Sequence, residues 1–186
     1  MSQFELLKFV ASLFEKLEVN WMLVGSYASS FYGEPRSTHD IDVLVDLPPS
    51  KIDSLLAAVP DDRYYLSGVA LREGRMANLI DTVTGDKIDL FLAAGDEPAV
   101  ATLTRRQQAN LHGVTVFVAS AEDTIIAKLK WSQQVGGSER QIRDIRGILI
   151  NQMPKIDLAA LRRRVAAEKL CSTWEEEIEP WLENKK

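Results

Sequence analysis

Three aspartates have the spacing and the surroundings that metal-dependent phosphoryl chemistry needs. Asp40 and Asp42 lie two residues apart in an otherwise apolar run, and Asp89 lies between two apolar residues. Side chains two apart in a strand project from the same face, so the first two carboxylates should lie together. Neighbouring carboxylates repel unless a cation lies between them, and Mg²⁺, or Mn²⁺ in its place, suits oxygen ligands and substrate phosphates. We therefore predict that Asp40, Asp42 and Asp89 are catalytic metal ligands, with Asp89 completing a two-metal site.

The sequence around these aspartates argues against the interpretation that they are only solvated or helix-capping side chains. A lone Asp-x-Asp on a surface is usually solvated or caps a helix, but a carboxylate buried in an apolar strand is costly without a partner. Lys87 has the same strand parity as Asp89. It is either a phosphate contact or a partner for the carboxylates.

A small-residue turn supplies the second part of the predicted site. Gly25 allows the backbone to come close to a ligand, and a helix that starts at Ser26 offers free N–H groups and a positive dipole end to a triphosphate. Arg36 and Thr38 share the face of the aspartates if the strand extends that far, and Arg36 would then neutralise phosphate charge. We predict that Gly25, Ser26, Arg36 and Thr38 bind the nucleotide.

Together these motifs resemble the nucleotidyltransferase superfold, which polymerase beta, CCA-adding enzymes and aminoglycoside nucleotidyltransferases share. The motifs are Leu23-Val24-Gly25-Ser26, Asp40-Ile41-Asp42-Val43 and Ile88-Asp89-Leu90, and the resemblance covers residues 20–118. It implies an α/β (α+β) fold with a mixed central sheet flanked by helices. It also implies an Mg-dependent transferase (EC 2.7.7.-) that moves a nucleoside monophosphate from a nucleoside triphosphate such as ATP to an acceptor hydroxyl and releases pyrophosphate.

A closer resemblance concerns the segment Gly33-x-Pro35-Arg36-x-Thr38-x-Asp40-Ile41-Asp42, which is similar to bacterial AbiEii-like nucleotidyltransferases of type IV toxin–antitoxin systems. That resemblance implies that Lys128 contacts nucleotide phosphate and that Asp144 positions it or the acceptor. It also implies a toxin-type role and a cognate antitoxin as partner. From the residues alone, Lys128 could equally be solvated, because Ile125, Ile126 and Leu129 mark another face of its helix. Asp144 could equally pair with Arg140.

The elements that would position these residues follow from periodicity and turn signals. A helix is expected over 4–17, before the strand 21–24 and the helix 27–31. Further strands are expected at 36–45, 65–72, 77–83, 87–92 and 114–118, a helix at 51–59, and a helical or irregular stretch at 98–110.

Beyond Ser120 the pattern is helical throughout. Capping-box spacings at Ser120 and Ser138 open two helices, and two more are expected over 158–168 and 173–182. The charge changes at the same place, since residues 1–119 carry a net −6 and residues 120–186 a net +1. We therefore predict a nucleotidyltransferase-fold domain at 1–119 and a C-terminal helical extension at 120–186.

Composition limits the class of protein. The 186 residues carry a net charge of −5 and 46% hydrophobic residues, which argues against a disordered chain or a generally basic nucleic-acid coat. No apolar stretch is long enough for a membrane span, and the amphipathic N-terminus does not have the pattern of a signal peptide. The lone Cys171 fits a reducing compartment. We expect a cytoplasmic protein.

The sequence also allows two other functions and several kinds of acceptor. The first alternative function is that of a non-catalytic nucleotide-binding or antitoxin-like partner protein. The second is an aminoglycoside-type antibiotic nucleotidyltransferase, for which Glu34, Asp81 and Glu122 could form an acidic acceptor pocket. The acceptor could be an RNA such as tRNA, a protein or a small molecule.

Overall fold

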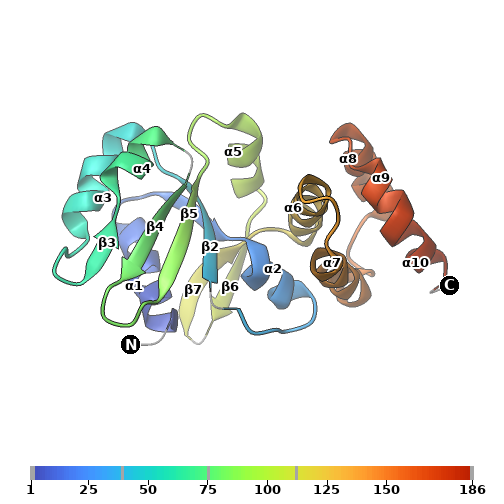
Figure 1. The fold of residues 1–186 in the computed structure, drawn as a ribbon, viewed down its shortest axis with the longest axis horizontal. Coiled ribbons are helices and arrows are strands. Elements are labelled where there is room, and N and C mark those ends of the chain that lie inside the picture. Colours follow the sequence, from blue (N-terminus) through green and yellow to red (C-terminus); the bar gives the residue numbers. More distant parts are fainter. Residues whose placement is uncertain (1–2, 39, 75, 112, 185–186) are drawn as a thin grey trace. The chain divides into compact units, whose positions relative to one another are not determined.

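A mixed seven-stranded sheet organises the first of two compact units (Figure 1). The computed structural model describes residues 3–38, 40–74, 76–111 and 113–184. The strand order is β3-β4-β5-β2-β1-β7-β6. The strands are β1 (Asn20–Leu23), β2 (Asp40–Asp46), β3 (Tyr64–Leu66), β4 (Met76–Asp81), β5 (Lys87–Leu92), β6 (Gln107–Leu111) and β7 (Val114–Val118). The predicted mixed sheet flanked by helices is confirmed.

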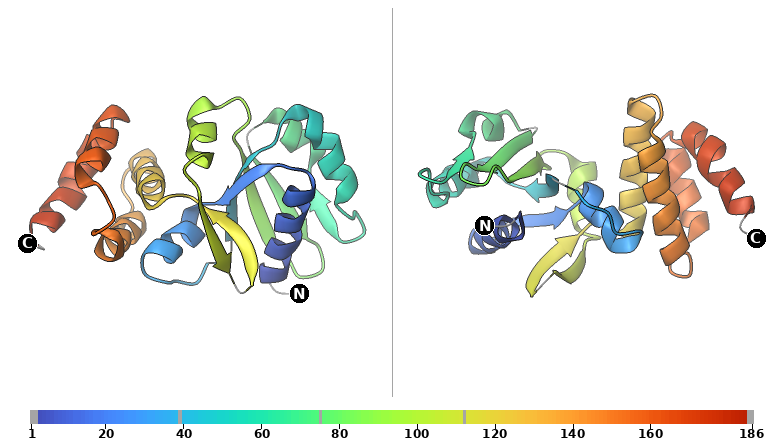
Figure 2. Two further views of the ribbon diagram at one scale, coloured as in Figure 1. Left: turned by 180° about the vertical axis from the view of Figure 1, so that it is seen from behind. Right: turned by 60° about the horizontal axis from the view of Figure 1, so that its bottom comes forward.

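The two faces of the sheet differ because residues alternate along each strand. On β2 the odd-numbered residues Ile41, Val43 and Val45 are fully buried, whereas the even-numbered residues are partly exposed. Helix α1 (Gln3–Lys16) packs against β5 and β7. Figure 2 shows it across the side of the sheet that is turned away in Figure 1. The other side of the sheet, here called the open face, carries Asp40 and Asp42.

Short helices connect the strands of the first unit. They are η1 (Pro49–Lys51), α3 (Ile52–Ala58), α4 (Gly68–Glu73) and α5 (Glu97–Leu103). The predicted strand at 65–72 is wrong beyond Leu66, because the side chain of Ser67 accepts a hydrogen bond from Ala70 N and starts α4. The stretch 98–110 divides into α5 and β6, which pairs with β7.

Strand β2 begins at Asp40, so Arg36 and Thr38 do not extend it as predicted. Residues 28–36 belong to the second compact unit, with residues 120–186. Gly33 explains this placement. A Cβ at Gly33 would lie 2.9 Å from the backbone nitrogen of Ile148 and 3.0 Å from the carbonyl carbon of Gly147. This close backbone contact holds the segment to a helix of the second unit.

The second unit is helical. Its helices are α6 (Ala121–Gln134), α7 (Glu139–Gln152), α8 (Leu158–Ala167), α9 (Cys171–Thr173), the π-helical turn η2 (Trp174–Ile178) and α10 (Glu179–Glu183). The predicted cap of α6 is present, since Ser120 Oγ accepts from Asp123 N at 3.1 Å. Helix α2 (Gly25–Tyr32) is divided between the units after Tyr27. Within the ranges that the structure describes, no helix is long and apolar enough to cross a bilayer.

Candidate active site

Parallel pairing of β2 with β5 brings the predicted catalytic aspartates together. Asp42 is the direct register partner of Asp89, and Asp40 is the partner of Lys87. Neighbouring strands lie about 4.8 Å apart, and paired residues point to the same face. Asp42 and Asp89 are therefore adjacent on the open face, with Asp40 one side-chain position farther along β2.

Lys87 joins two of these carboxylates. Its Nζ lies 3.3 Å from Oδ1 of Asp40 and 3.1 Å from Oδ2 of Asp89. The hydrogen bond to Asp89 raises the pKa of the Lys87 ammonium, and the bond to Asp40 acts in the same direction. Of the two roles considered for Lys87, the structure shows that of a partner for the carboxylates.

Asp89 is held from the opposite side by a residue that the sequence analysis missed. Only 8% of Asp89 is exposed, and Asn78 Nδ2 donates a hydrogen bond to its Oδ1. Asn78 is the register partner of Asp89 on β4. Its signal in the sequence is an amide in the middle of an apolar strand, one strand away from an apolar-flanked aspartate. Asn78 and Lys87 together orient the Asp89 carboxylate.

The turn at Gly25 lies directly against Asp42. Gly25 has a φ of +57°, and a Cβ at this position would lie 2.1 Å from Oδ2 of Asp42. The N–H of Val24 also donates to the backbone oxygen of Asp42 at 2.9 Å. Helix α2 begins at Gly25, one residue before the predicted cap at Ser26, and Ser26 is buried. The predicted turn and the carboxylate strand thus form one contiguous structure.

Thr38 precedes this strand, and its hydroxyl donates to the backbone oxygen of Asp40 at 3.2 Å. Its side chain is therefore committed to the start of β2. This bond explains the position of Thr38 without a ligand, and its predicted contact with nucleotide stays a prediction.

A second charged cluster lies within the helical unit. Lys128 Nζ is 2.7 Å from Oδ2 of Asp144 and 3.0 Å from Oε1 of Gln141. Arg36 donates to both oxygens of the same carboxylate, through Nε at 3.2 Å and through one terminal nitrogen at 3.2 Å. The hydroxyl of Ser29 donates to Oδ2 of Asp144 at 3.3 Å. Asp144 therefore bridges two cations.

Burial corrects one interpretation of this cluster. Lys128 is only 5% exposed, so the alternative of a solvated lysine is wrong. Burial lowers the pKa of the Lys128 ammonium, against the opposing hydrogen bond to Asp144. Burial alone would raise the pKa of Asp144, but the hydrogen bonds from Lys128 and Arg36 outweigh it and hold that pKa below its ordinary value. Asp144 is firmly ionised, and one net positive charge remains.

The aspartates on β2 and β5 match a divalent cation in charge and in donor chemistry. Magnesium prefers hard carboxylate oxygens, and the Lys87 ammonium between Asp40 and Asp89 shows that this position favours a positive charge. Among the residues that the structure describes, no group of three His, Cys, Asp or Glu side chains is arranged to enclose a metal ion. The residues fit an ion that is shared with a bound substrate, with Lys87 as its competitor.

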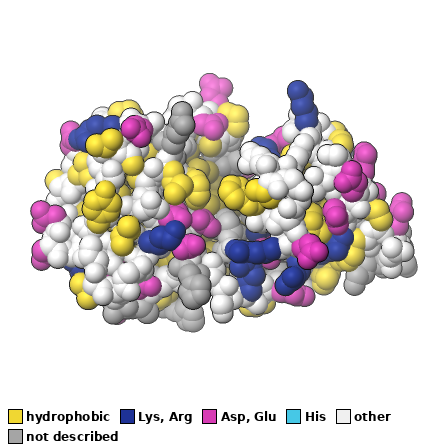
Figure 3. Space-filling view, viewed as in Figure 1, with side chains coloured by type: hydrophobic (Ala, Val, Ile, Leu, Met, Phe, Trp, Pro, Cys, Tyr) yellow, Lys and Arg dark blue, Asp and Glu magenta, His cyan; other side chains and the backbone are white. Residues whose placement is uncertain are grey.

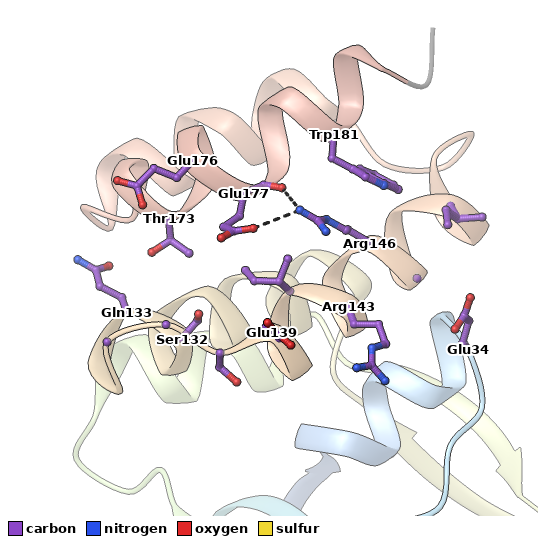
Figure 4. Close-up of a pocket in the computed structure, with 16 residues that line it drawn as sticks. Glu34, Ser132, Gln133, Glu139, Arg143, Arg146, Thr173, Glu176, Glu177 and Trp181 are labelled. Carbon is purple, nitrogen blue, oxygen red and sulfur yellow. Dashed lines mark hydrogen bonds and ion pairs between the residues drawn. The ribbon is translucent and has the colours of Figure 1, made fainter.

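A cavity of about 770 Å³ lies within the helical unit (Figure 4). In this cavity Arg146 donates to the backbone oxygen of Glu177 at 2.6 Å and to its carboxylate at 3.2 Å. The guanidinium of Arg146 lies 6.0 Å from the ring centre of Trp181. Four glutamates line the cavity, namely Glu34, Glu139, Glu176 and Glu177.

The other two acids considered for an acceptor pocket have different surroundings. Asp81 is buried and forms an ion pair with Arg63 at 2.8 Å, so it acts as a structural carboxylate. Glu122 lies on α6. Burial of the Tyr32 hydroxyl raises its pKa to about 12, and the negative charges of Glu122 and Asp123 act in the same direction. Neither residue belongs to the cavity lined by Glu34.

The sheet order, the glycine turn against Asp42 and the Asp42–Asp89 pair define a protein with the nucleotidyltransferase fold. The chain belongs to a family described as nucleotidyltransferase of unknown function (DUF6036), which matches residues 3–181. No curated protein matches the sequence.

Solved structures with the same fold share little sequence with the chain. An antigenic nucleotidyltransferase-like protein from Paracoccidioides brasiliensis is 18% identical with a TM-score of 0.57, covering 94% of this chain and 92% of that one. ANT(2")-Ia in complex with adenylyl-2"-tobramycin is 18% identical with a TM-score of 0.58, covering 87% and 97%. The lincosamide antibiotic adenylyltransferase LnuA, bound to lincomycin, is 14% identical with a TM-score of 0.53, covering 76% and 93%.

Proposed function

We propose that this protein transfers a nucleoside monophosphate from a nucleoside triphosphate to an acceptor hydroxyl and releases pyrophosphate. The observation that carries the proposal is the register pair of Asp42 and Asp89 on the open face, with the Gly25 turn packed against Asp42. Two adjacent carboxylates beside the first turn of a helix suit a metal-bound triphosphate. Membership of the nucleotidyltransferase family supports the same reaction class.

In this reaction the acceptor oxygen forms a bond to the α-phosphorus while the bond from that phosphorus to the bridging oxygen breaks. The electron pair leaves with pyrophosphate, and the hydroxyl proton passes to the carboxylate of Asp89. Asp40, Asp42 and Asp89 would hold divalent magnesium, or manganese, which supplies polarisation of the phosphate oxygens when bound. Asn78 keeps Oδ1 of Asp89 in place, and Oδ2, which Lys87 contacts in this structure, would accept the proton.

The nucleotide would be recognised mainly through its phosphates. We propose that Gly25 and Ser26, at the start of α2, contact the triphosphate through backbone N–H groups. The cluster of Arg36, Lys128 and Asp144 keeps one positive charge in excess, which supports the predicted phosphate contact by Lys128 and Arg36. In that cluster Asp144 positions the two cations.

The physiological role extends the proposal further. We propose a cytoplasmic enzyme related to AbiEii-like toxins and paired with an antitoxin, with tRNA, protein or a small molecule as acceptor. An antibiotic nucleotidyltransferase is the second candidate. The cavity of the helical unit is lined by four glutamates and two arginines, and this acidic excess favours it, because aminoglycosides are cationic. The presence of all three aspartates argues against the rival of a non-catalytic partner protein.

A direct test measures nucleotide transfer and pyrophosphate release with labelled nucleoside triphosphates, Mg²⁺ and separate pools of tRNA, protein and small molecules. We expect label in one pool, and we expect Asp42→Asn to lower the rate at least about a hundredfold, as for loss of a metal ligand. Asp46→Asn is the matched control, since Asp46 lies on the same strand and face but outside the Asp42–Asp89 pair. Absence of metal-dependent nucleotide binding by the wild type would overturn the proposal.

A further inference from the structure

An apolar row crosses the open face of the sheet next to the aspartates. Leu44 on β2 is the register partner of Phe91 on β5, and Phe91 is the partner of Met76 on β4. The row lies one side-chain position from the row formed by Asp42, Asp89 and Asn78. Two residues along a strand span about 7 Å, which sets the separation of the two rows. In Figure 3 hydrophobic side chains accordingly lie beside acidic ones over the sheet.

The row is exposed only at one end. On β1 the partner of Leu44 is Met22, which is 2% exposed. Phe91 is 37% exposed and Met76 is 42% exposed. Isolated apolar side chains are common on protein surfaces. Here a phenyl ring and a thioether are paired in register beside a buried carboxylate. Together they place an apolar platform at the candidate active site.

The position of the platform indicates what binds there. The Gly25 turn, where the triphosphate is proposed to bind, contacts Asp42 on the β1 side of the site. Phe91 and Met76 lie on the opposite side, over β5 and β4, next to Asp89 and Asn78. Asp89 is the proposed acceptor of the hydroxyl proton. A group over Phe91 would thus lie beside Asp89, where the acceptor hydroxyl must react, and away from the turn proposed for the triphosphate.

We propose that Leu44, Phe91 and Met76 form an acceptor subsite for a small molecule with an apolar or aromatic group about 7 Å from its reacting hydroxyl. Phenyl and thioether groups are polarisable and pack well against flat or irregular apolar groups. The subsite rests on the proposed function, because it is the reacting hydroxyl at Asp89 that defines its distance. It favours an acceptor with such a group, so the polar, cationic aminoglycosides of the second candidate function would be poor substrates.

Binding can be tested without turnover. In protein labelled at the methionine methyl groups, we expect 3-phenylpropan-1-ol to shift the Met76 signal saturably, while propan-1-ol, which lacks the ring, does not. The Met76→Leu variant assigns that signal, and Met153, which follows α7 and lies outside the row, serves as the internal control. A Met76 signal that responds equally to both alcohols, or to neither, overturns the subsite.

Transfer gives the second readout. With labelled nucleoside triphosphate, we expect Phe91→Ala to lower kcat/KM for 3-phenylpropan-1-ol about tenfold relative to propan-1-ol, as for the loss of an apolar pocket contact. Val83→Ala removes an exposed apolar side chain outside the row, and we expect it to leave kcat/KM unchanged for both alcohols. An equal effect of Phe91→Ala on both alcohols overturns the subsite.

The two proposals can fail separately. A saturable Met76 shift in a protein that transfers no nucleotide to any acceptor would refute the proposed function and support only the apolar binding site. Transfer that depends on Asp42 but ignores the phenyl group, with no selective Met76 shift, would uphold the proposed function and refute the subsite. The methyl signals of the wild type keep the test valid even where a variant folds poorly.

Discussion

Gly25 and Asp42 are in contact so close that no side chain fits between them. A Cβ on Gly25 would lie 2.1 Å from Oδ2 of Asp42 and 2.8 Å from its carboxyl carbon. Real Cβ atoms essentially never come so near another atom, so any substitution must move the carboxylate or the turn. The turn and the predicted metal ligand therefore form one unit that depends on glycine.

The first prediction concerns this contact. Gly25→Ala should displace the Asp42 carboxylate and lower the rate of nucleotide transfer at least about tenfold, because misplaced catalytic groups lose rate steeply. Gly74→Ala is the control, since Gly74 also has a positive φ but an added Cβ would meet nothing within 4 Å. Gly74→Ala should cost only the backbone strain, about 1 kcal/mol. Similar transfer rates for the two variants would contradict the role of the contact.

The second prediction concerns Lys87 as the cation between Asp40 and Asp89. Lys87→Met removes the ammonium and leaves the two carboxylates to repel each other, so stability without Mg²⁺ should fall. Added Mg²⁺ should then raise Tm more in this variant than in the wild type, because a ligand of the folded state stabilises it. Thermal unfolding over a series of Mg²⁺ concentrations measures both effects.

Lys51→Met is the control for that experiment. Lys51 donates to the backbone oxygens of Leu17 and Glu18, so its loss should lower stability with no change in the response to Mg²⁺. An identical Mg²⁺ response in Lys87→Met and the wild type would show that the metal does not bind at this pair of carboxylates.

The third prediction compares two lysines on α6. Lys128→Ala leaves the buried carboxylate of Asp144 with Arg36 as its remaining cation, and should lower the free energy of unfolding by about 3 kcal/mol. Lys130→Ala breaks an exposed pair with Glu168 and should cost less than about 1 kcal/mol. Denaturant unfolding of both variants measures the difference. Equal costs would mean that the burial of Lys128 adds nothing to stability.

The fourth prediction is the pH dependence of the same cluster. The bonds from Lys128 and Arg36 hold the pKa of Asp144 below its ordinary value of about 3.9. The unfolded chain therefore binds this proton first as pH falls, so the stabilisation by Asp144 is present at neutral pH and lost in acid. Asp144→Asn should remove this acid-sensitive part.

Above neutral pH, the free energy of unfolding of Asp144→Asn should depend on Lys128. In Asp144→Asn the buried Lys128 loses the negative charge that opposes the lowering of its pKa by burial. The unfolded chain then binds this proton still more tightly than the folded one, so the stability of the variant should rise more steeply than that of the wild type as pH increases above neutral. Asp46→Asn should keep the smaller rise of the wild type, because Asp144 is unchanged there. Unfolding free energies from pH 3 to 10 test both sides.

Much of the site followed from periodicity and motif spacing. Alternation along a strand placed Asp40 and Asp42 on one face, and the same rule favoured Lys87 as a neighbour of Asp89. What it could not supply was the partner strand, and hence Asn78, because register depends on pairing between segments that are distant in sequence. That information exists only in the folded sheet.

The errors have physical reasons of the same kind. The apolar run of Val69, Ala70 and Leu71 favours a strand, but a single hydroxyl at Ser67 caps a helix there. The apolar stripe of Ile125, Ile126 and Leu129 predicts an outer face for Lys128. The helix is in fact buried on a wider face, and the ammonium is satisfied by Asp144. Strand alternation predicts Arg36 on the face of the aspartates only if the strand extends that far, and β2 begins at Asp40.

The pairing of β2 with β5 also bears on how reliably the molecule folds. A slip of one residue would place Ile88 or Leu90 opposite Asp42, and would turn the charged Lys87 and Asp89 into the apolar interior. Such a chain would expose the aliphatic side chains that now form the core, which strongly disfavours it. Errors of strand alignment that would destroy the carboxylate pair are therefore rejected during folding, and a molecule with a complete core also has Asp42 and Asp89 in alignment.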